Sequence, residues 1–222
     1  MSKLVTAEGA PVTFLFDLFF TLVTFEPGVY EREFERLDIP MTEWERCVAE
    51  SGAYVGRVTE PMEIIRAFTC CAKKSFGEEQ LRRLCENRMA RVREIVTKVR
   101  PEILETLRTL KERGHGLCLV SNADAIDVLP WKDSPLCPLF DEVVFSCEVR
   151  LQKPDPAIYR LAMRRMGAQP EDCIFVGDGG SNELAGAKAV GLRTVQVRHF
   201  LQREAAGADC AVDRFADILA IS

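Results

Sequence analysis

Polar side chains that could take part in catalysis stand at the ends of predicted strands and at the start of one predicted helix. They are Asp17 with Thr21 after residues 14–16, Ser121 with Asn122 after 117–120, Asp178 with Glu183 after 173–177, and Lys153 just before Pro154 and Pro156. Functional groups in an open parallel sheet collect beyond the carboxyl ends of the strands. We therefore expect these side chains to meet at one edge of a sheet.

Asp17 is the first candidate, because an apolar strand delivers it to a buried position. A buried carboxylate costs free energy unless a partner compensates its charge. Such a group can attack phosphorus or an activated carbon and form a covalent intermediate that water later cleaves. It could instead cap the turn that follows the strand. The later polar groups favour the nucleophile, since each supplies a partner that a reacting carboxylate needs.

Ser121 and Lys153 are suited to binding the group that is transferred. The Ser121 hydroxyl can donate to a phosphoryl or carboxylate oxygen, and the alternative is a helix N-cap after the strand. Lys153 would neutralise charge that develops on the transferred group, and the alternative is a solvated surface lysine. Asn122, beside Ser121, is a further candidate for contacting the substrate.

Asp178 and Glu183 follow a strand in a glycine-rich loop and would bring two more negative charges to Asp17. Carboxylates gathered in this way have raised pKa values or attract a cation. Mg²⁺ fits, because it prefers a few carboxylates together with waters and substrate phosphate. The alternative is a simple turn, which Asp and Gly favour in any case.

The order of these groups resembles the four motifs of the haloacid dehalogenase superfamily of hydrolases. Those motifs are Asp-x-Asp-x-Thr, a Ser or Thr at a strand end, a Lys, and a Gly-Asp acidic loop. The matches are Asp17 with Thr21, Ser121, Lys153, and Asp178 with Glu183, and they cover most of the chain outside residues 25–98. The resemblance implies that Thr21, Ser121 and Lys153 assist catalysis by Asp17. It also implies that Mg²⁺ is held by Asp17, Asp178 and the main-chain carbonyl of Phe19.

Phe19 departs from the pattern, since the phosphatases of this family carry their general acid/base Asp at that position. A phenyl ring can neither protonate a leaving oxygen nor activate water, which is typically worth about 10²–10⁴-fold in rate. The dehalogenases of the family carry an aromatic residue there and need no metal. Phe19 is therefore also a candidate for contacting the substrate.

Three functions remain open at this point. The first is Mg²⁺-dependent hydrolysis of a small phosphorylated metabolite. The second is hydrolytic dehalogenation of a small halogenated acid, which would need no cofactor. The third is a catalytically weakened member that binds a ligand or a protein partner. Fold alone does not separate them, because function resides in the site.

The apolar periodicity predicts an α/β fold, with a doubly wound, Rossmann-like parallel sheet and a small α-helical cap. Strands are expected at 12–16, 117–120, 143–146, 173–177 and 193–197. Helices are expected at 156–166 and 182–190, and a short one at 213–220. We place the core at 1–24 and 99–222 and the cap at 25–98, with hinges at Gly28 and at Arg100-Pro101.

One helix within the expected cap has a clear apolar face. Its members are Leu81, Leu84, Cys85, Met89, Val92, Ile95 and Val96. The helix that Pro101 opens is expected to end near Gly114.

The composition agrees with a soluble enzyme, which we expect to lie in the cytoplasm, and the resemblance implies a small-molecule substrate. The 222 residues are 47% hydrophobic and 28% charged, with a formal net charge of −5. This negative net charge does not indicate binding to nucleic acid or to an anionic membrane. The N-terminus lacks a signal-peptide pattern, and no apolar run approaches the ~20 residues of a membrane span. The nine cysteines are expected to be reduced, and zinc is disfavoured because only two histidines are present.

Overall fold

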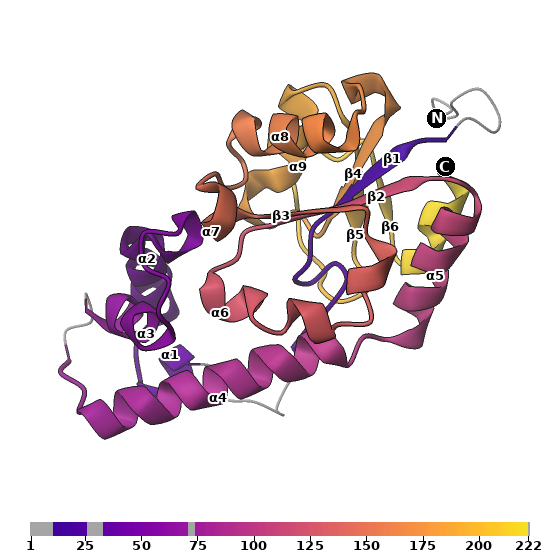
Figure 1. The fold of residues 1–222 in the computed structure, drawn as a ribbon. Coiled ribbons are helices and arrows are strands. Elements are labelled where there is room, and N and C mark those ends of the chain that lie inside the picture. Colours follow the sequence, from indigo (N-terminus) through magenta and orange to yellow (C-terminus); the bar gives the residue numbers. More distant parts are fainter. Residues whose placement is uncertain (1–10, 26–32, 71–73, 222) are drawn as a thin grey trace.

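The computed structural model describes residues 11–25, 33–70 and 74–221. Its centre is a six-stranded parallel sheet with strand order β3-β2-β1-β4-β5-β6 (Figure 1). The strands are β1 (Thr13–Phe16), β2 (Gly116–Ser121), β3 (Glu142–Phe145), β4 (Cys173–Gly177), β5 (Arg193–Val197) and β6 (Cys210–Val212).

The first strand lies in the middle of the sheet. Thr13 of β1 pairs with Gly116 on one side and with Cys173 on the other, so the three strands start in register. The apolar residues of β1 alternate between the two faces. Phe14 and Phe16 belong to one apolar cluster, whereas Leu15 belongs to the second. Strands buried on both faces read as continuous apolar runs, and β1, β2 and β4 do so.

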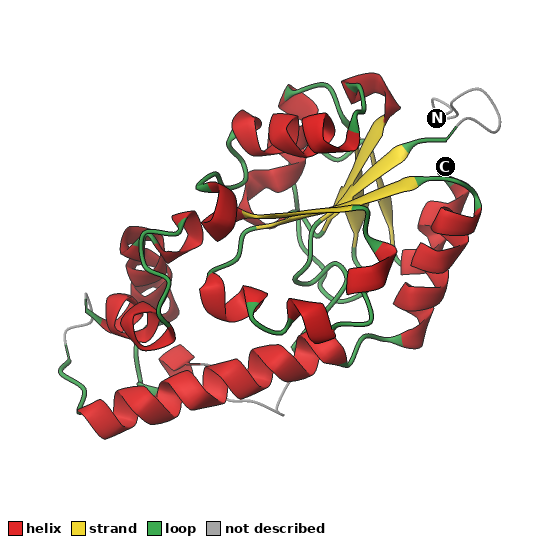
Figure 2. Cartoon of the chain, viewed as in Figure 1, coloured by secondary structure: helices red, strands yellow, loops and turns green. Residues whose placement is uncertain are grey.

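Helices cover both faces of the sheet, which confirms the doubly wound α/β prediction (Figure 2). The helix α5 (Pro101–Glu112) packs with the 3₁₀ helix η6 (Phe215–Ala220) over the face that carries Phe14 and Phe16. The helices α8 (Pro156–Met166) and α9 (Glu183–Ala189) cover the opposite face. Their first residues lie within one position of those predicted.

A helical segment, residues 33–97, stands between β1 and β2 in the chain. It contains α1 (Glu33–Arg36), α2 (Met41–Ser51), the 3₁₀ helix η1 (Ala53–Val55), α3 (Pro61–Thr69) and α4 (Glu78–Thr97). The long α4 runs from beside α3 to beside α6 (Ala125–Val128), as Figure 1 shows. The division into core and cap stays a prediction, and Gly28 lies outside the described residues.

The apolar face predicted for α4 differs from the prediction at Met89, which is an exposed side chain. Arg88 and Arg91 are buried instead. Both arginines have buried carboxylate partners. Arg88 bonds to Asp124 and Asp127, and Arg91 pairs with a buried Glu33.

The ends of the sheet differ from the sequence prediction in small ways. β6 was not predicted, because this edge strand has only three residues, and all three are apolar although Ala211 is exposed and Cys210 and Val212 are partly buried. The closing helix is a 3₁₀ helix rather than an α-helix. The helix α7 (Ser146–Val149) is a single turn that follows β3 directly, which periodicity cannot detect.

The prediction of reduced cysteines is wrong at Cys47 of α2, which is disulfide-bonded. Among the described residues, seven cysteines are free thiols, and Cys118, Cys147 and Cys173 of these lie in the core.

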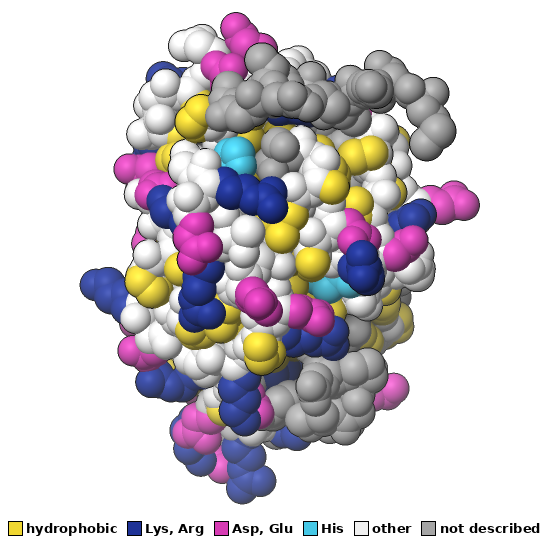
Figure 3. Space-filling model, turned by 90° about the vertical axis from the view of Figure 1, so that its right-hand side faces the viewer, with side chains coloured by type: hydrophobic (Ala, Val, Ile, Leu, Met, Phe, Trp, Pro, Cys, Tyr) yellow, Lys and Arg dark blue, Asp and Glu magenta, His cyan; other side chains and the backbone are white. Residues whose placement is uncertain are grey.

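The surface carries charges of both signs. On the face shown in Figure 3, acidic and basic side chains are interspersed with apolar ones. Among the described residues, none of the helices has the length and apolar character needed to cross a membrane.

Candidate active site

Asp17 stands at the carboxyl end of the central strand. Its backbone N–H donates to the Val176 carbonyl at 3.0 Å, which continues the pairing of β1 with β4 by one residue. The chain then turns tightly, and the Leu22 N–H donates to the Leu18 carbonyl at 2.8 Å. This turn brings the Thr21 hydroxyl back to donate to Asp17 Oδ2 at 3.0 Å. Thr21 thus orients the predicted nucleophile.

Lys153 joins two of the carboxylates. Its Nζ donates to Asp17 Oδ1 at 2.5 Å and to Glu183 Oε2 at 2.6 Å. The side chain is 2% exposed, so the surface-lysine alternative is wrong. Burial alone would lower the pKa of Lys153, but the charges of Asp17 and Glu183 outweigh burial and raise it. The ammonium group therefore remains charged at neutral pH.

Asn122 fixes the backbone at Lys153. Its side-chain Nδ2 donates to the Lys153 carbonyl at 2.9 Å, and its Oδ1 accepts from the Lys153 N–H at 2.7 Å. This two-bond clamp ties the end of β2 to the loop before α8. Asn122 also lines the cavity above Asp17, as its predicted role in substrate contact requires.

Glu183 is buried at the first turn of α9. Its Oε1 accepts from the Gly179 N–H at 3.1 Å. The same oxygen passes so close to Gly177 that a Cβ there would lie 2.2 Å from it, so a larger residue at the end of β4 would displace the Glu183 carboxylate. Burial, and then the charge of Asp17, raises the pKa of Glu183.

The two carboxylate oxygens of Asp178 have different partners. Oδ1 accepts from the Gly180 N–H at 2.9 Å, whereas Oδ2 is buried and accepts no hydrogen bond. Oδ2 is ion-paired with Arg203, whose Nη2 lies 3.4 Å away. Burial and the nearby charge of Asp17 raise the pKa of Asp178, although Arg203 and Lys153 oppose the shift. The Gly180 contact is also the one expected of a simple turn, so the metal role of Asp178 stays a prediction.

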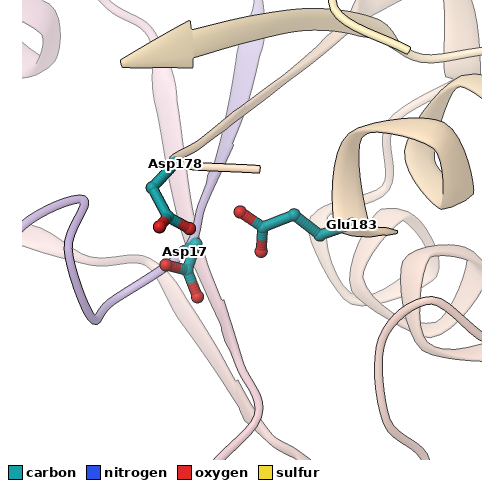
Figure 4. A group of neighbouring side chains, drawn as sticks. All are labelled: Asp17, Asp178 and Glu183. Atoms are coloured by element: carbon teal, nitrogen blue, oxygen red, sulfur yellow. The ribbon is translucent and has the colours of Figure 1, made fainter. Parts of the chain in front are cut away.

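Three carboxylates converge in this site, as Figure 4 shows. Oxygens of Asp17, Asp178 and Glu183 all lie within 4.8 Å of one another. An all-oxygen donor set of this kind fits a hard divalent cation such as Mg²⁺. The buried Oδ2 of Asp178 is a second observation that fits, because it accepts no hydrogen bond and its ion pair with Arg203 is long, at 3.4 Å.

Ser121 is not the N-cap of the helix that follows β2, which was the structural alternative to a catalytic role. The N-cap of the next helix, α6, is Asp124, which accepts from the Ile126 N–H at 2.8 Å. Ser121 is the last residue of β2, and its hydroxyl is fully buried without a partner. It does not line the cavity, whereas its neighbour Asn122 does.

A cavity of about 360 Å³ opens above the carboxylates. Asp17, Lys153, Asp178 and Glu183 line it from the side of the sheet. Residues of the helical segment, and Arg203 from the loop between β5 and β6, complete the wall. Sequence reasoning missed Arg203, because the loop that carries it has neither periodicity nor a motif.

Comparison with known proteins agrees with this geometry. Residues 12–191 match the family model described as haloacid dehalogenase-like hydrolase. A phosphoglycolate phosphatase of Salmonella choleraesuis (strain SC-B67) is 29% identical, and the match covers 99% of this chain and 94% of that protein.

Two further similarities divide between phosphatases and dehalogenases. A glyceraldehyde 3-phosphate phosphatase of Methanopyrus kandleri is 35% identical over 44% of this chain, but the match covers only 42% of that relative. A crystal structure of a dehalogenase superposes with a TM-score of 0.72 at 20% identity, covering 98% of this chain and 99% of that one. At that identity the dehalogenase shows a shared fold only.

Proposed function

Since this chain belongs to the haloacid dehalogenase-like hydrolases, we propose that it is an Mg²⁺-dependent phosphatase of a small phosphorylated metabolite. The observation that carries this proposal is the buried cluster of Asp17, Asp178 and Glu183, in which Oδ2 of Asp178 accepts no hydrogen bond and is ion-paired with Arg203 at 3.4 Å. A dehalogenase acting through Asp17 would need no metal there. Two relatives, 29% and 35% identical to this chain, are named as phosphatases, which also supports a phosphatase activity.

Asp17 would act as the nucleophile. One carboxylate oxygen forms a bond to phosphorus while the bond to the leaving oxygen breaks, and water then cleaves the acyl-phosphate. The Thr21 hydroxyl holds Oδ2 and the Lys153 ammonium holds Oδ1, so the carboxylate is fixed before the substrate arrives. Lys153 also compensates charge on the transferred group. The leaving oxygen must take its proton from water, because Phe19 supplies none.

Asp17, Asp178 and the main-chain carbonyl of Phe19 would hold Mg²⁺, with Glu183 as a further carboxylate of the cluster. When bound, the ion would supply electrostatic stabilisation of the phosphoryl oxygens. Both Glu183 oxygens already have partners, in Lys153 and the Gly179 N–H. We therefore assign Glu183 a positioning role toward Lys153 as well. The Ser121 hydroxyl is buried and does not line the cavity, so we assign it no contact with the substrate in this structure.

Dehalogenation is the second candidate, and one observation favours it. Phe19 lines the cavity beside Asp17, where a phosphatase of this family would carry its acid. A halide leaves without a proton and would not need one. In this case Asp17 would form an ester with carbon, and Asp178 would have no metal to bind.

Replacement of the nucleophile tests both enzymatic candidates. Asp17→Asn removes the attacking charge while keeping the shape, so we expect turnover to be lost and the fold to persist. Phosphate release from phosphate esters and halide release from 2-haloacids are measured with Mg²⁺ and with chelator. Loss of Mg²⁺-dependent phosphate release in Asp17→Asn would support the phosphatase.

Two controls make the test sharp. Thermal melts with and without millimolar Mg²⁺ report metal binding independently of activity, because a ligand of the native state raises Tm. Asp178→Asn should abolish that rise. Halide release that chelator leaves unchanged, together with a Tm indifferent to Mg²⁺, would replace the phosphatase by the dehalogenase.

A further inference from the structure

The wall of the cavity that faces the three carboxylates is aromatic. Phe19, Phe20 and Phe25 line it from the segment after β1. Phe34, Trp44, Tyr54 and Phe68 line it from the helical segment. These rings are organised: Phe19 and Phe25 stack with parallel planes at 6.0 Å, and Trp44 meets Phe68 edge to face at 5.6 Å. A substrate that places its phosphoryl group at Asp17 must direct the rest of itself toward this wall.

The arginines on this wall are already neutralised. Arg88 donates to Asp124 at 2.6 Å and to Asp127 at 3.0 Å, and all three side chains are buried. It also lies over the Phe68 ring at 5.0 Å. A guanidinium that has two carboxylate partners offers little net attraction to a third anion.

Arg91 repeats this arrangement on the other side of the wall. It is paired with Glu33, and its guanidinium lies over the Phe25 ring at 5.0 Å. Its Nε has no partner but is fully buried, so a ligand in the cavity does not reach it. The remaining charged residue that lines the cavity from the helical segment is acidic, Glu45. Within its described residues, the helical segment therefore offers the cavity no free cation. Arg203 lines the cavity beside Asp178 instead, with its Nη2 3.4 Å from Oδ2 of that carboxylate.

We infer that the leaving group of the substrate is apolar or aromatic and uncharged, rather than a carboxylate or a polyhydroxylated chain. This inference rests on the proposed phosphatase function and names its substrate class. A carboxylate placed against the wall would lose its hydration without gaining a cation, which is unfavourable. A ring would stack on the aromatic side chains, and such pairs contribute about 0.5–1.5 kcal/mol beyond the area they bury.

Binding of non-hydrolysable phosphonates tests the inference without requiring turnover. The probes are 2-phenylethylphosphonate, with an aromatic tail, and 3-phosphonopropionate, which carries a carboxylate. Both are titrated calorimetrically into the Mg²⁺-loaded protein. We expect the aromatic probe to bind at least ~10-fold more tightly. Equal binding, tighter binding of the carboxylate, or no saturable binding of either probe at millimolar concentration would overturn the inference.

A matched pair of variants locates the preference on the wall. Phe34→Leu keeps an apolar side chain in the cavity but removes a ring, so the ratio of the two affinities should fall by about 3-fold or more. Phe76→Leu is the control, because Phe76 is a partly buried aromatic residue of the helical segment that does not line the cavity. An equal fall in both variants would place the preference elsewhere and contradict the inference.

The corresponding phosphate esters separate this inference from the proposed function. 2-Phenylethyl phosphate and phosphoglycolate both release alkyl alcohols, so leaving-group acidity is similar and kcat/KM reports recognition. Efficient hydrolysis of phosphoglycolate, but not of the phenylethyl ester, would overturn the aromatic substrate class and leave the phosphatase intact. If the protein hydrolyses neither these two esters nor any other phosphate ester, but releases halide from haloacids, the phosphatase proposal itself is overturned.

Discussion

At the scale of single residues, Phe19 separates the two candidate reactions. It occupies the position of a general acid/base, yet its ring stacks on Phe25 in the cavity wall. Phe19→Asp would insert a carboxyl that can protonate a leaving oxygen. If the rest of the site is that of a phosphatase, kcat/KM for alkyl phosphates should rise by about 10-fold or more, within the range of general acid catalysis.

The dependence on leaving group checks the origin of that gain. It should be largest for alkyl phosphates and small for nitrophenyl phosphate, whose leaving group needs no proton. The variant should also lose about 1–3 kcal/mol of stability with the ring contact, so thermal melts must accompany the kinetics. A folded, Mg²⁺-binding Phe19→Asp that gains nothing with alkyl phosphates would count against a phosphatase site.

The sequence predicted which residues lie together in the site, but it did not predict which hydrogen bonds and ion pairs they form. Asp17, Asp178 and Glu183 could be placed together because each follows a buried strand, and the structure does bring them together. The bond from Lys153 to Glu183 could not be predicted, because the sequence does not say which carboxylate Lys153 contacts. Arg203 gave no signal at all, since a loop residue is positioned by tertiary contacts rather than by any local pattern.

At the scale of elements, Arg88 fastens the helix α4 to α6. In Arg88→Met the carboxylates of Asp124 and Asp127 would stay buried without their cation. Breaking a buried pair in this way costs about 3–5 kcal/mol. Burial and the neighbouring Asp124 already raise the pKa of Asp127 to about 6, so the loss should be greatest at neutral pH and smaller in mild acid.

The same helix provides the control. Arg83 of α4 pairs with Glu79 on the surface, where its side chain is 70% exposed. Arg83→Met should change the free energy of unfolding by less than about 1 kcal/mol. Urea denaturation of both variants at pH 7 makes the comparison. A similar small loss in Arg88→Met would mean that the buried pairing contributes little.

The elements themselves were predicted more reliably than the orientation of their faces. The strands and the longer helices of the sheet region follow from apolar periodicity and from Pro and Gly signals. The apolar pattern of α4 is interrupted by buried arginines, and no local rule says that an arginine will turn inward. Their orientation depends on carboxylates about 35 to 60 positions away, as the bonds of Arg88 and Arg91 show.

At the scale of the whole molecule, His199 should make stability depend on pH. Burial, and then the charge of Arg100, lowers the pKa of His199 from 6.5 to about 4. The Thr21 backbone opposes this shift, but no hydrogen bond of normal geometry joins the two. Between pH 6.5 and 4 the unfolded chain binds a proton that the folded chain does not. The free energy of unfolding must therefore fall as the pH falls through this window.

A variant isolates this contribution from others of opposite sign, such as that of Asp127. His199→Leu keeps apolar contact with Phe200 and Phe215 but cannot titrate. Between pH 7 and pH 5, the wild type should lose about 1 kcal/mol more than His199→Leu, a figure reduced for the solvent that screens a half-buried ring. Urea denaturation at both pH values provides the difference. An identical pH dependence in the two proteins would contradict a depressed pKa.

The central position of β1 has a consequence for how the chain folds. This strand is synthesised before the others, but its two neighbours, β2 and β4, begin at Gly116 and Cys173. It cannot pair until the whole helical segment and β2 have left the ribosome, and it is enclosed only after β4 follows. Pairings so distant in sequence require closure of long loops, which slows folding. Until then the apolar run around Phe14 and Phe16 is exposed, and it is the segment that a chaperone should bind first during synthesis.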